Sequence, residues 1–401
     1  MLKALFILFF VVSNSISGIL QDVIDHASPF STIKLPSGVY IGNIIIEKPL
    51  QIIGLDNAII KGDNTGTVVT INSSHVILQN LTITHSGNRI DKIDAAIRIN
   101  KANKCEISSC KILDSLYGID MLMVENSLIS DNYITSKKED IEFRGNALKL
   151  YYSHNNKFLK NTITGTKDVT LNYSHHNLFK ENKFIKNRFS SHLSLSNDNI
   201  FKNNYYQYNS VAIMLMGAKN TQILNNHILS STGTAGIGVM IKGVENFQFK
   251  NNILKYNAKG LYIDSQEKMK GMKRYIIGNE ISYNSEAIHF HASIKDNTIT
   301  HNKIFSNIED IVKDMDSGLY PSNVIEYNYW DRYAGFDNNH DNIGDTPHQV
   351  YLYSDQLWQY NNKVKFYYAS PIMSLLNFLS HLAPFIEPKL IFEDNKPIFR
   401  D

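Results

Sequence analysis

Three methionines and two histidines form a pattern that could bind a soft metal ion. In several segments, apolar residues alternate with other residues as in a half-buried β-strand, so every second side chain points away from the core. In this alternation Met214, Met216, Met240, His289 and His291 point outward. Methionine normally faces a core, and thioether with imidazole is a ligand set that Cu(I) selects. The pattern predicts a copper site; the alternative is a surface where a partner or loop covers ordinary methionine contacts.

Carboxylates do not form a catalytic pattern on the same surface. The alternation assigns one outward pair to each successive repeat: Asp120/Leu122, Lys149/Tyr151, Thr170/Asn172, Ser194/Ser196, Met214/Met216, Met240/Lys242, Tyr262/Asp264 and His289/His291. Stacking in register would place Met214 beside Met240. Cleavage of acidic polysaccharides needs paired acids, whereas Asp120 and Asp264 stand several repeats apart. The sequence therefore predicts a protein that is not an enzyme.

A repeated asparagine predicts the elements that carry these side chains. Asn recurs every 21 to 29 residues, each time two before an aliphatic or aromatic residue and three after another apolar one, at Asn132, Asn161, Asn182, Asn204, Asn226, Asn252, Asn279, Asn302 and Asn328. Short strands on such a period indicate a solenoid. We expect an all-β protein, a parallel β-helix of about 11 or more coils with three strands in each coil.

The asparagine has a physical reason to recur at a corner between strands. It tolerates the left-handed backbone conformation and bonds to neighbouring backbone groups. Identical amides stacked from coil to coil would also form a ladder of hydrogen bonds. Leu81 and Cys110 occupy the equivalent positions upstream.

A second candidate metal site lies in the Asp/Asn-rich segment after the repeats. Asp337, Asn339, Asp341 and Asp345 stand at positions 1, 3, 5 and 9 of a loop, and Ile343 at position 7 could offer its carbonyl. Oxygen ligands at this spacing suit Ca²⁺. The glycine and glutamate that an EF-hand has at positions 6 and 12 are missing. Asx turns without a metal are the alternative.

The termini predict export and a capped rod. Lys3 precedes an apolar run that is too short to span a bilayer, followed by a small-x-small pattern ending at Ser17, so residues 1–18 are read as a cleavable signal peptide of a soluble, exported protein. Residues 19–330 would form the β-helix and residues 331–401 a C-terminal loop, cap and helix. One apolar stripe of that helix, which would pack over the rod's open end, comprises Ile372, Leu375, Leu376, Leu379 and Leu382.

Charge and cysteine content exclude other classes. The formal net charge of +2 over 401 residues gives no support to nucleic acid as a partner. Cys105 and Cys110 fall in one coil at inward positions. We expect buried free thiols there, with a local disulfide or a metal pair as alternatives.

The C-terminal part of the sequence resembles a known family. The residues that carry the resemblance are 328–337 (NYWDRYAGFD), 343–347 (IGDTP), 364–371 (VKFYYASP) and 382–385 (LAPF). Together with the asparagine repeat, they make the chain similar to NosD, the periplasmic maturation proteins of nitrous oxide reductase. The resemblance spans nearly the whole mature chain, and the segment 287–290 (AIHF) matches the family's habit of placing histidine on outward coil positions.

The resemblance implies a role that the residues alone do not show. It implies a right-handed β-helix in the periplasm that helps to assemble the tetranuclear copper-sulfide centre of nitrous oxide reductase. The implied partners are the reductase, the membrane subunit of an ABC transporter and a copper-donor lipoprotein. Docking against that transporter becomes a second explanation for the C-terminal apolar stripe. The alternative function, a secreted polysaccharide lyase, hydrolase or carbohydrate-binding protein, is supported only by fold.

Overall fold

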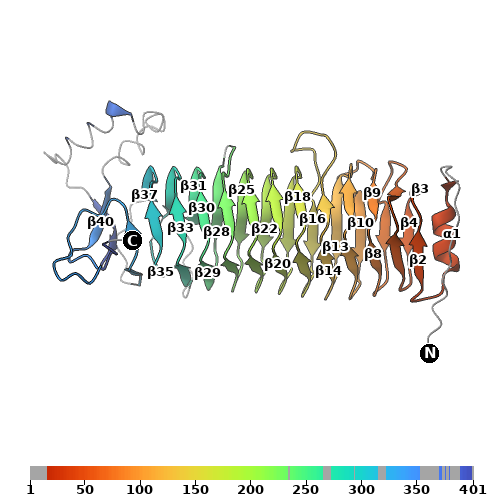
Figure 1. The fold of residues 1–401 in the computed structure, drawn as a ribbon, viewed down its shortest axis with the longest axis horizontal. Helices are drawn as coiled ribbons and strands as arrows, with labels where there is room; N and C mark the ends of the chain where they lie inside the picture. Colours follow the sequence, from red (N-terminus) through yellow and green to blue (C-terminus); the bar gives the residue numbers. More distant parts are fainter. Residues whose placement is uncertain are drawn as a thin grey trace.

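The chain forms a right-handed parallel β-helix, as predicted (Figure 1). The structure is a computed structural model and describes residues 16–233, 235–264, 272–292, 294–314, 322–352, 370–372, 375, 379 and 389–399. Three sheets, here named A, B and C, run along the rod, and each coil contributes one strand to each of them in that order. Among the described residues no helix is long and apolar enough to cross a membrane.

The strands of the three sheets pair in parallel with the coil before and the coil after. The 13 strands of sheet A are β2 (Thr32–Leu35), β5 (Gln51–Gly54), β8 (Ile77–Gln79), β11 (Glu106–Ser108), β14 (Leu128–Ser130), β17 (Lys157–Leu159), β20 (Leu178–Lys180), β23 (Ile200–Lys202), β26 (Gln222–Leu224), β29 (Phe247–Lys250), β32 (Arg274–Ile277), β35 (Asn297–Thr300) and β38 (Val324–Glu326). The 14 strands of sheet B are β1 (Ile16–Ser17), β3 (Gly38–Ile41), β6 (Ala58–Lys61), β9 (Thr82–Thr84), β12 (Lys111–Leu113), β15 (Tyr133–Ile134), β18 (Thr162–Thr164), β21 (Lys183–Ile185), β24 (Tyr205–Gln207), β27 (His227–Leu229), β30 (Ile253–Lys255), β33 (Glu280–Ser282), β36 (Lys303–Phe305) and β39 (Tyr329–Trp330). The 12 strands of sheet C are β4 (Ile44–Ile46), β7 (Val69–Ile71), β10 (Ala95–Asn100), β13 (Tyr117–Leu122), β16 (Leu148–Tyr151), β19 (Asp168–Asn172), β22 (Phe189–Ser194), β25 (Val211–Met216), β28 (Ile237–Lys242), β31 (Lys259–Asp264), β34 (Glu286–His291) and β37 (Glu309–Lys313).

The predicted asparagine ladder occupies the corner between sheets A and B. The side-chain Nδ2 of Asn204 donates to Oδ1 of Asn226 (3.0 Å) and to the carbonyl of Phe179 (2.9 Å). The same Oδ1 of Asn226 also accepts the backbone N–H of Asn204 (2.8 Å). Asn226 repeats this pattern with Asn252. Each buried amide thus bonds to a backbone carbonyl of the preceding coil and to the asparagine of the next coil. The ladder therefore fixes the register in which the coils stack.

The left-handed backbone conformation falls on a different residue from the one predicted. The residue before each ladder asparagine has the positive φ, for example Lys160, Glu181 and Asn203. The ladder asparagines have no positive φ. The amide must point inward to reach its neighbours, and the preceding residue makes the turn. The asparagine is therefore required for its hydrogen bonds.

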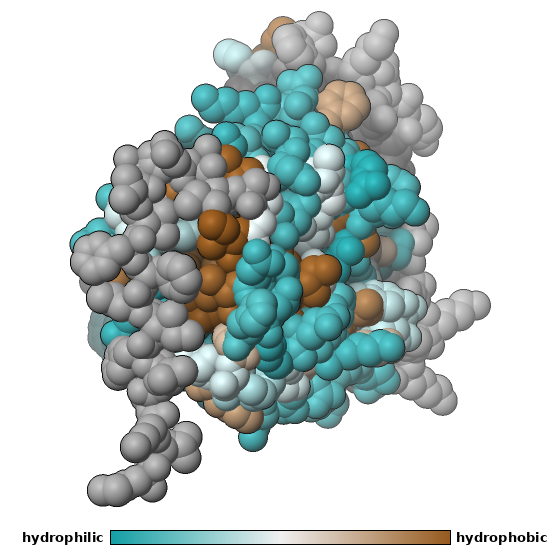
Figure 2. Space-filling view, turned by 90° about the vertical axis from the view of Figure 1, so that its right-hand side faces the viewer, coloured by the Kyte–Doolittle hydropathy of each residue, from teal (hydrophilic) through white to brown (hydrophobic). Residues whose placement is uncertain are grey.

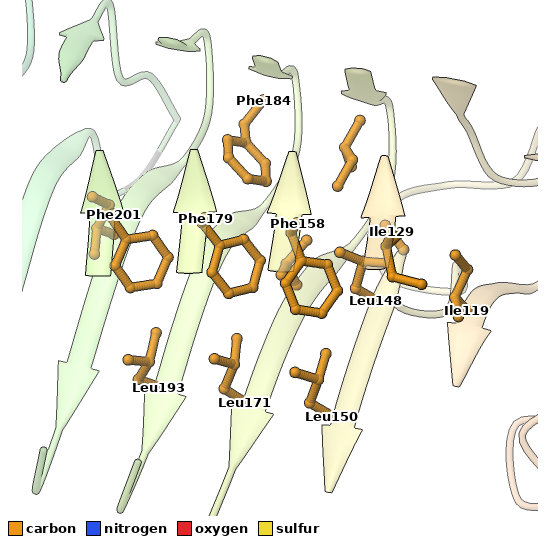
Figure 3. Close-up of a cluster of buried hydrophobic side chains, with 14 of the residues drawn as sticks. Ile119, Ile129, Leu148, Leu150, Phe158, Leu171, Phe179, Phe184, Leu193 and Phe201 are labelled. Atoms are coloured by element: carbon orange, nitrogen blue, oxygen red, sulfur yellow. The ribbon is translucent and has the colours of Figure 1, made fainter. Parts of the chain in front are cut away.

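The core is a set of apolar columns parallel to the rod axis (Figure 3). Phe158, Phe179 and Phe201 stack ring on ring, with centroids 4.4 Å and 5.0 Å apart. Leu171 and Leu193 belong to a leucine column from sheet C that lies opposite. In-register stacking repeats one kind of residue at one depth, and aromatic rings packed in this way gain contact energy beyond burial.

A short helix covers the N-terminal end. Helix α1 (Ile19–His26) buries Leu20 and Ile24. The Gln21 side chain bonds both backbone groups of Ile45, accepting its N–H (2.8 Å) and donating to its carbonyl (3.1 Å). Figure 2 looks onto this end and shows hydrophobic side chains at its centre among polar ones. Gln21 thus occupies part of the open edge of sheet C, which would otherwise be free to pair with another chain.

A carboxylate ends the asparagine ladder at the other end of the rod. Strands β40 (His348–Leu352) and β41 (Lys389–Asp394) form an antiparallel pair next to the last coil. Oδ2 of Asp394 accepts from Nδ2 of Asn328 (2.9 Å) and from Nε1 of Trp330 (3.0 Å). Burial raises the pKa of Asp394, and the hydrogen bonds to Trp330 and Asn328 only partly offset this effect.

Residues that carry the family resemblance build this C-terminal cap. The Tyr333 hydroxyl donates to the carbonyl of Thr346 (2.7 Å). A Cβ at Gly335 or Gly344 would lie 2.0 Å or 2.1 Å from that hydroxyl, so a larger residue at either position would displace Tyr333. The Asp331 carboxylate accepts the N–H of Ser306 in the last full coil (2.6 Å). The segments 328–337 and 343–347 of the signature are therefore explained locally by how the rod is closed, whereas 364–369 and 382–385 lie outside the described residues.

We predict that single losses in the ladder are costly. Asn204→Ala or Asn226→Ala leaves the amide and backbone groups of adjacent coils unpaired and should each destabilise the protein by about 1–3 kcal/mol. Asn172→Ala, on the outer surface of sheet C, is the matched control and should change stability little. Denaturant unfolding of the three variants measures this, and equal small effects at all three positions would contradict the ladder's role.

The ladder's end predicts different costs for two substitutions at Asp394 and a pH-dependent stability difference between wild type and Asp394→Asn. Asp394→Ala removes the acceptor of Asn328 and Trp330 and should cost about 1–3 kcal/mol. Asp394→Asn keeps an acceptor and cannot ionise. Because the folded-state pKa is raised, wild type loses stability relative to Asp394→Asn as pH rises from the unfolded pKa through the folded one. Melting curves of wild type and both variants at pH 4 and pH 7 test this, and a stability difference between wild type and Asp394→Asn that is the same at both pH values would refute it.

Candidate functional site

The predicted soft donors lie on the outer surface of sheet C. We call the outward side chains of strands β13 to β34 the C-face. These side chains form two columns along the rod. Met214 pairs with Met240 in the first column, and Met216 pairs with Lys242 in the second. His289 and His291 pair with Tyr262 and Asp264. The predicted register is thus correct for the methionine and histidine coils, and the structure puts Met214 and Met240 on adjacent strands.

One coil of the predicted C-face is wrong. The outward pair of β22 is His192 and Ser194, which face Met214 and Met216, instead of Ser194 and Ser196. Ser196 is buried in the next corner, where its hydroxyl donates to the carbonyl of Leu171 (3.0 Å). Leu193, fully buried, fills the core position, while Leu195 is 49% exposed.

A spacing signal could have found His192. Asn182 to Asn204 and Asn204 to Asn226 are both 22 residues apart. Subtracting 22 from Met214 gives position 192. The alternation alone failed because Leu193 and Leu195 both satisfy it.

His192 is a half-buried imidazole with an unused nitrogen. Its Nε2 is shielded from solvent and has no hydrogen-bond partner. Burial lowers the pKa of His192, an effect that Arg188 adds to and Asp168 opposes. The ring is therefore neutral at pH 7, which is the form that binds metals.

Ion pairs bound this uncharged part of the C-face on both sides. On the N-terminal side, Asp120 bridges Arg98 (3.0 Å) and Lys149 (3.3 Å). On the C-terminal side, Lys242 reaches Asp264 (3.3 Å). His192, Met214 and Met240 thus form a stretch of uncharged donors between two charged networks.

The second predicted pair, His289 and His291, lies in a network of opposite charges. Oε2 of Glu286 lies 2.5 Å from Nδ1 of His289 and 2.5 Å from Nζ of Lys259. Oδ2 of Asp314 lies 2.9 Å from Nε2 of His289, at ion-pair distance but without the angle of a hydrogen bond, and 3.1 Å from Nδ1 of His291. The sequence did not reveal Glu286 and Asp314 as neighbours, because Asp314 comes from the next coil.

The network sets the protonation of its members. Burial lowers the pKa of His289, but Asp314 and Glu286 outweigh it and the net pKa is raised. Burial raises the pKa values of Glu286 and Asp314, but their contacts with His289 outweigh this effect and leave both pKa values lowered. Tyr262 stacks on His289 with centroids 4.8 Å apart, and burial with nearby carboxylates raises its pKa to about 12. His289 is therefore engaged in charge pairing, with Tyr262 between it and Met240.

Copper fits the donor set of one part of the C-face better than the other. In the part of the chain that the structure describes, no three His, Cys, Asp or Glu side chains come together as a metal site. Methionine thioethers are not among these four donor types, so a site that includes them has to be judged separately. His192, whose Nε2 has no partner, pairs with Met214, and Met214 pairs with Met240, so this column carries a soft donor combination.

The predicted calcium loop is held by hydrogen bonds to its own backbone. The Asp337 carboxylate accepts the N–H groups of Asp341 (3.2 Å) and Asn342 (3.0 Å). Asp341 accepts the N–H of Ile343 (2.8 Å), and Asn339 donates to Asp341 (3.0 Å). Asp345 accepts the N–H of Asn338 (2.8 Å). The bond from Ile343 to Asp341 is an Asx turn, a cation would have to compete with all of these hydrogen bonds, and calcium binding stays a prediction.

The C-terminal stripe is described only in part. The backbone at residues 371, 372, 375 and 379 is helical, and the side chains of Ile372, Leu375 and Leu379 are 67%, 55% and 48% exposed. Leu376 and Leu382 lie outside the described residues, as does the predicted signal segment up to residue 15. Docking by this stripe stays a prediction.

The two cysteines are buried free thiols, as expected. Burial raises the pKa of Cys110 to about 12 and also raises that of Cys105. The N–H of Cys110 donates to Oδ1 of Asn132 (2.9 Å), so Cys110 begins the ladder.

The fold and the C-face define a right-handed β-helix that presents thioether and imidazole donors on one sheet. Comparison with known proteins identifies its family. The family described as "Periplasmic copper-binding protein (NosD)" matches residues 133–335, and the chain belongs to that family. It is 22% identical to the "Probable ABC transporter binding protein NosD" of Stutzerimonas stutzeri, over 92% of this chain and 86% of that protein. It is 23% identical to the protein of the same description from Pseudomonas aeruginosa, over 92% and 88%.

The chain shares its fold with solved structures of enzymes that act on acidic polysaccharides. A mannuronic acid specific family 6 polysaccharide lyase from human gut microbiota has a TM-score of 0.56 at 13% identity, covering 79% of this chain and 86% of that one. The A-module of the Azotobacter vinelandii mannuronan C-5 epimerase AlgE6 has a TM-score of 0.51 at 16% identity, covering 77% and 93%. At these identities the similarity concerns the fold alone.

The Asp/Asn loop yields a direct test for calcium. If Ca²⁺ binds Asp337, Asn339, Asp341, Asp345 and the carbonyl of Ile343, excess calcium should raise the melting temperature and a chelator should reverse the rise, because a ligand of the folded state stabilises it. Asp341→Ala should abolish the response, whereas Asn172→Ala should keep it. A wild-type melting curve that is the same with calcium and after chelation would dispose of the site.

Proposed function

We propose that this chain is a periplasmic accessory protein that handles copper for the assembly of the copper-sulfide centre of nitrous oxide reductase. In this role it is a scaffold without catalytic turnover and works with an ABC transporter. Export would depend on the signal peptide read in residues 1–18. A copper-donor lipoprotein would supply the metal.

One observation carries the proposal: a member of a periplasmic copper-binding family presents methionine and neutral histidine outward on consecutive strands. Outward methionines add little to a monomer's stability, because their contacts lie outside the core. Thioethers bind Cu(I) well and hard cations poorly. The C-face therefore suits transient handling of Cu(I).

The partner assignments have separate support. Both relatives are described as probable ABC transporter binding proteins. The exposed Ile372, Leu375 and Leu379 offer an apolar surface that suits docking to a transporter subunit. The reductase as recipient follows from the family resemblance. A polysaccharide-active function has the shared fold as its support, and fold does not determine function.

The proposal predicts a copper-deficient reductase in cells without this chain. Deleting its gene from cells that express nitrous oxide reductase should lower the copper content of the purified reductase and remove the absorption of its tetranuclear centre. The wild-type gene should restore both. Replacing Met214 and Met240 together with leucine keeps apolar volume, so that variant should be folded and fail to restore copper. Full copper loading in the deletion strain would contradict the proposal.

A further inference from the structure

We propose that His192, Met214 and Met240 are the three ligands of a single Cu(I) site, and that His289 and His291 are not part of it. This inference rests on the proposed copper-handling function and names the ligands of that function. It assigns Cu(I) binding to one position in the middle of sheet C instead of to the C-face as a whole.

The register brings the three donors together. His192 pairs with Met214, and Met214 pairs with Met240, so the residues occupy one column on β22, β25 and β28. Strands in a sheet lie about 4.8 Å apart. A cation over the middle strand would be bound from below by Met214 and from either side by His192 and Met240. The unbranched methionine side chain has the freedom to reach such a point.

The imidazole of His192 has a nitrogen that the protein itself leaves unused. Nε2 is excluded from solvent and no described group bonds to it. Buried polar atoms normally have a partner, and each exception calls for an explanation. A bound cation on the same column would complete the coordination of this nitrogen.

The chemistry of the donors selects the oxidation state. One imidazole and two thioethers carry no charge, so the site suits a soft, monovalent, low-coordinate cation. A harder divalent ion would need more imidazole, thiolate or carboxylate ligands than the one imidazole here, and the nearby Asp168 is engaged by Arg188 (2.9 Å) and Asp264 by Lys242 (3.3 Å). The site should therefore prefer Cu(I) to Zn²⁺.

His289 and His291 are separated from the three donors by Tyr262 and by their own ion pairs. Tyr262 stands between Met240 and His289 in the same column and stacks on His289, so the position between them holds an aromatic ring and no soft donor. His289 is held between Glu286 and Asp314, which also contacts His291. A cation there would have to break these ion pairs and displace Lys259 from Glu286.

Competition with a chromophoric Cu(I) chelator tests the assignment on the full chain under anaerobic conditions. His192→Gln, Met214→Leu and Met240→Leu should each weaken Cu(I) binding by about tenfold or more, since loss of even an outer-shell partner commonly costs about 10–100-fold. Met216→Leu, in the neighbouring column, and His289→Gln, in the ion-pair network, are matched controls and should change the affinity less than about twofold.

His192→Met separates a ligand role from a structural one. It keeps a soft donor at the position, so it should bind Cu(I) much more tightly than His192→Gln if residue 192 is a ligand. Melting temperatures of all variants monitor folding. Equal loss of affinity in His289→Gln and His192→Gln, or wild type that binds no Cu(I), would overturn the assignment.

The outcome is distinguishable from failure of the proposed function. If the reductase is loaded normally without this chain, but the affinities follow the predicted pattern, the Cu(I) site stands and the role in reductase assembly fails. If the reductase lacks copper but the affinities do not follow the pattern, the role stands and the ligand assignment fails.

Discussion

The structure depends on one repeated hydrogen bond, the side-chain amide of an asparagine in one coil bonded to that of the next. Because Oδ1 of Asn226 accepts both the amide and the backbone N–H of Asn204, a coil cannot slide without losing buried hydrogen bonds. The ladder starts at Cys110 and ends on Asp394, which comes from the cap 66 residues beyond Asn328. Register is therefore fixed along the rod and at its C-terminal end.

Fixed register turns sequence positions into columns, and the columns create the site. The same stacking that aligns Phe158, Phe179 and Phe201 in the core aligns His192, Met214 and Met240 on the surface. A slip of one residue on one strand would send its donor into the core. Rigid strands hold donors in place more reliably than loops, which suits a protein that must bind a reactive metal and release it.

Much of this could be predicted from the sequence. The asparagine period predicted the β-helix, and alternation placed Met214 opposite Met240. Alternation missed His192, because Leu193 and Leu195 are equally apolar and alternation alone does not show which is buried. Alternation could not predict partners that come from other parts of the chain, such as Asp314 beside His289 and Asp394 at the end of the ladder. Such contacts depend on where loops and caps return the chain, and local patterns do not encode that.

The family signature and the site also separate in space. Tyr333, Gly335 and Gly344 close the rod's C-terminal end, whereas the soft donors lie in mid-rod. Conspicuous motifs in a solenoid can thus mark its caps, because the caps are the parts that do not repeat.

X-ray absorption at the copper K edge, on the full chain loaded with one equivalent of Cu(I), tests the central claim most directly. The account predicts a first shell with two sulfur scatterers and one nitrogen. Since both cysteines are buried and their pKa values raised, the sulfur would come from thioethers and should vanish in the Met214→Leu, Met240→Leu double variant. A first shell of nitrogen and oxygen alone would contradict the account.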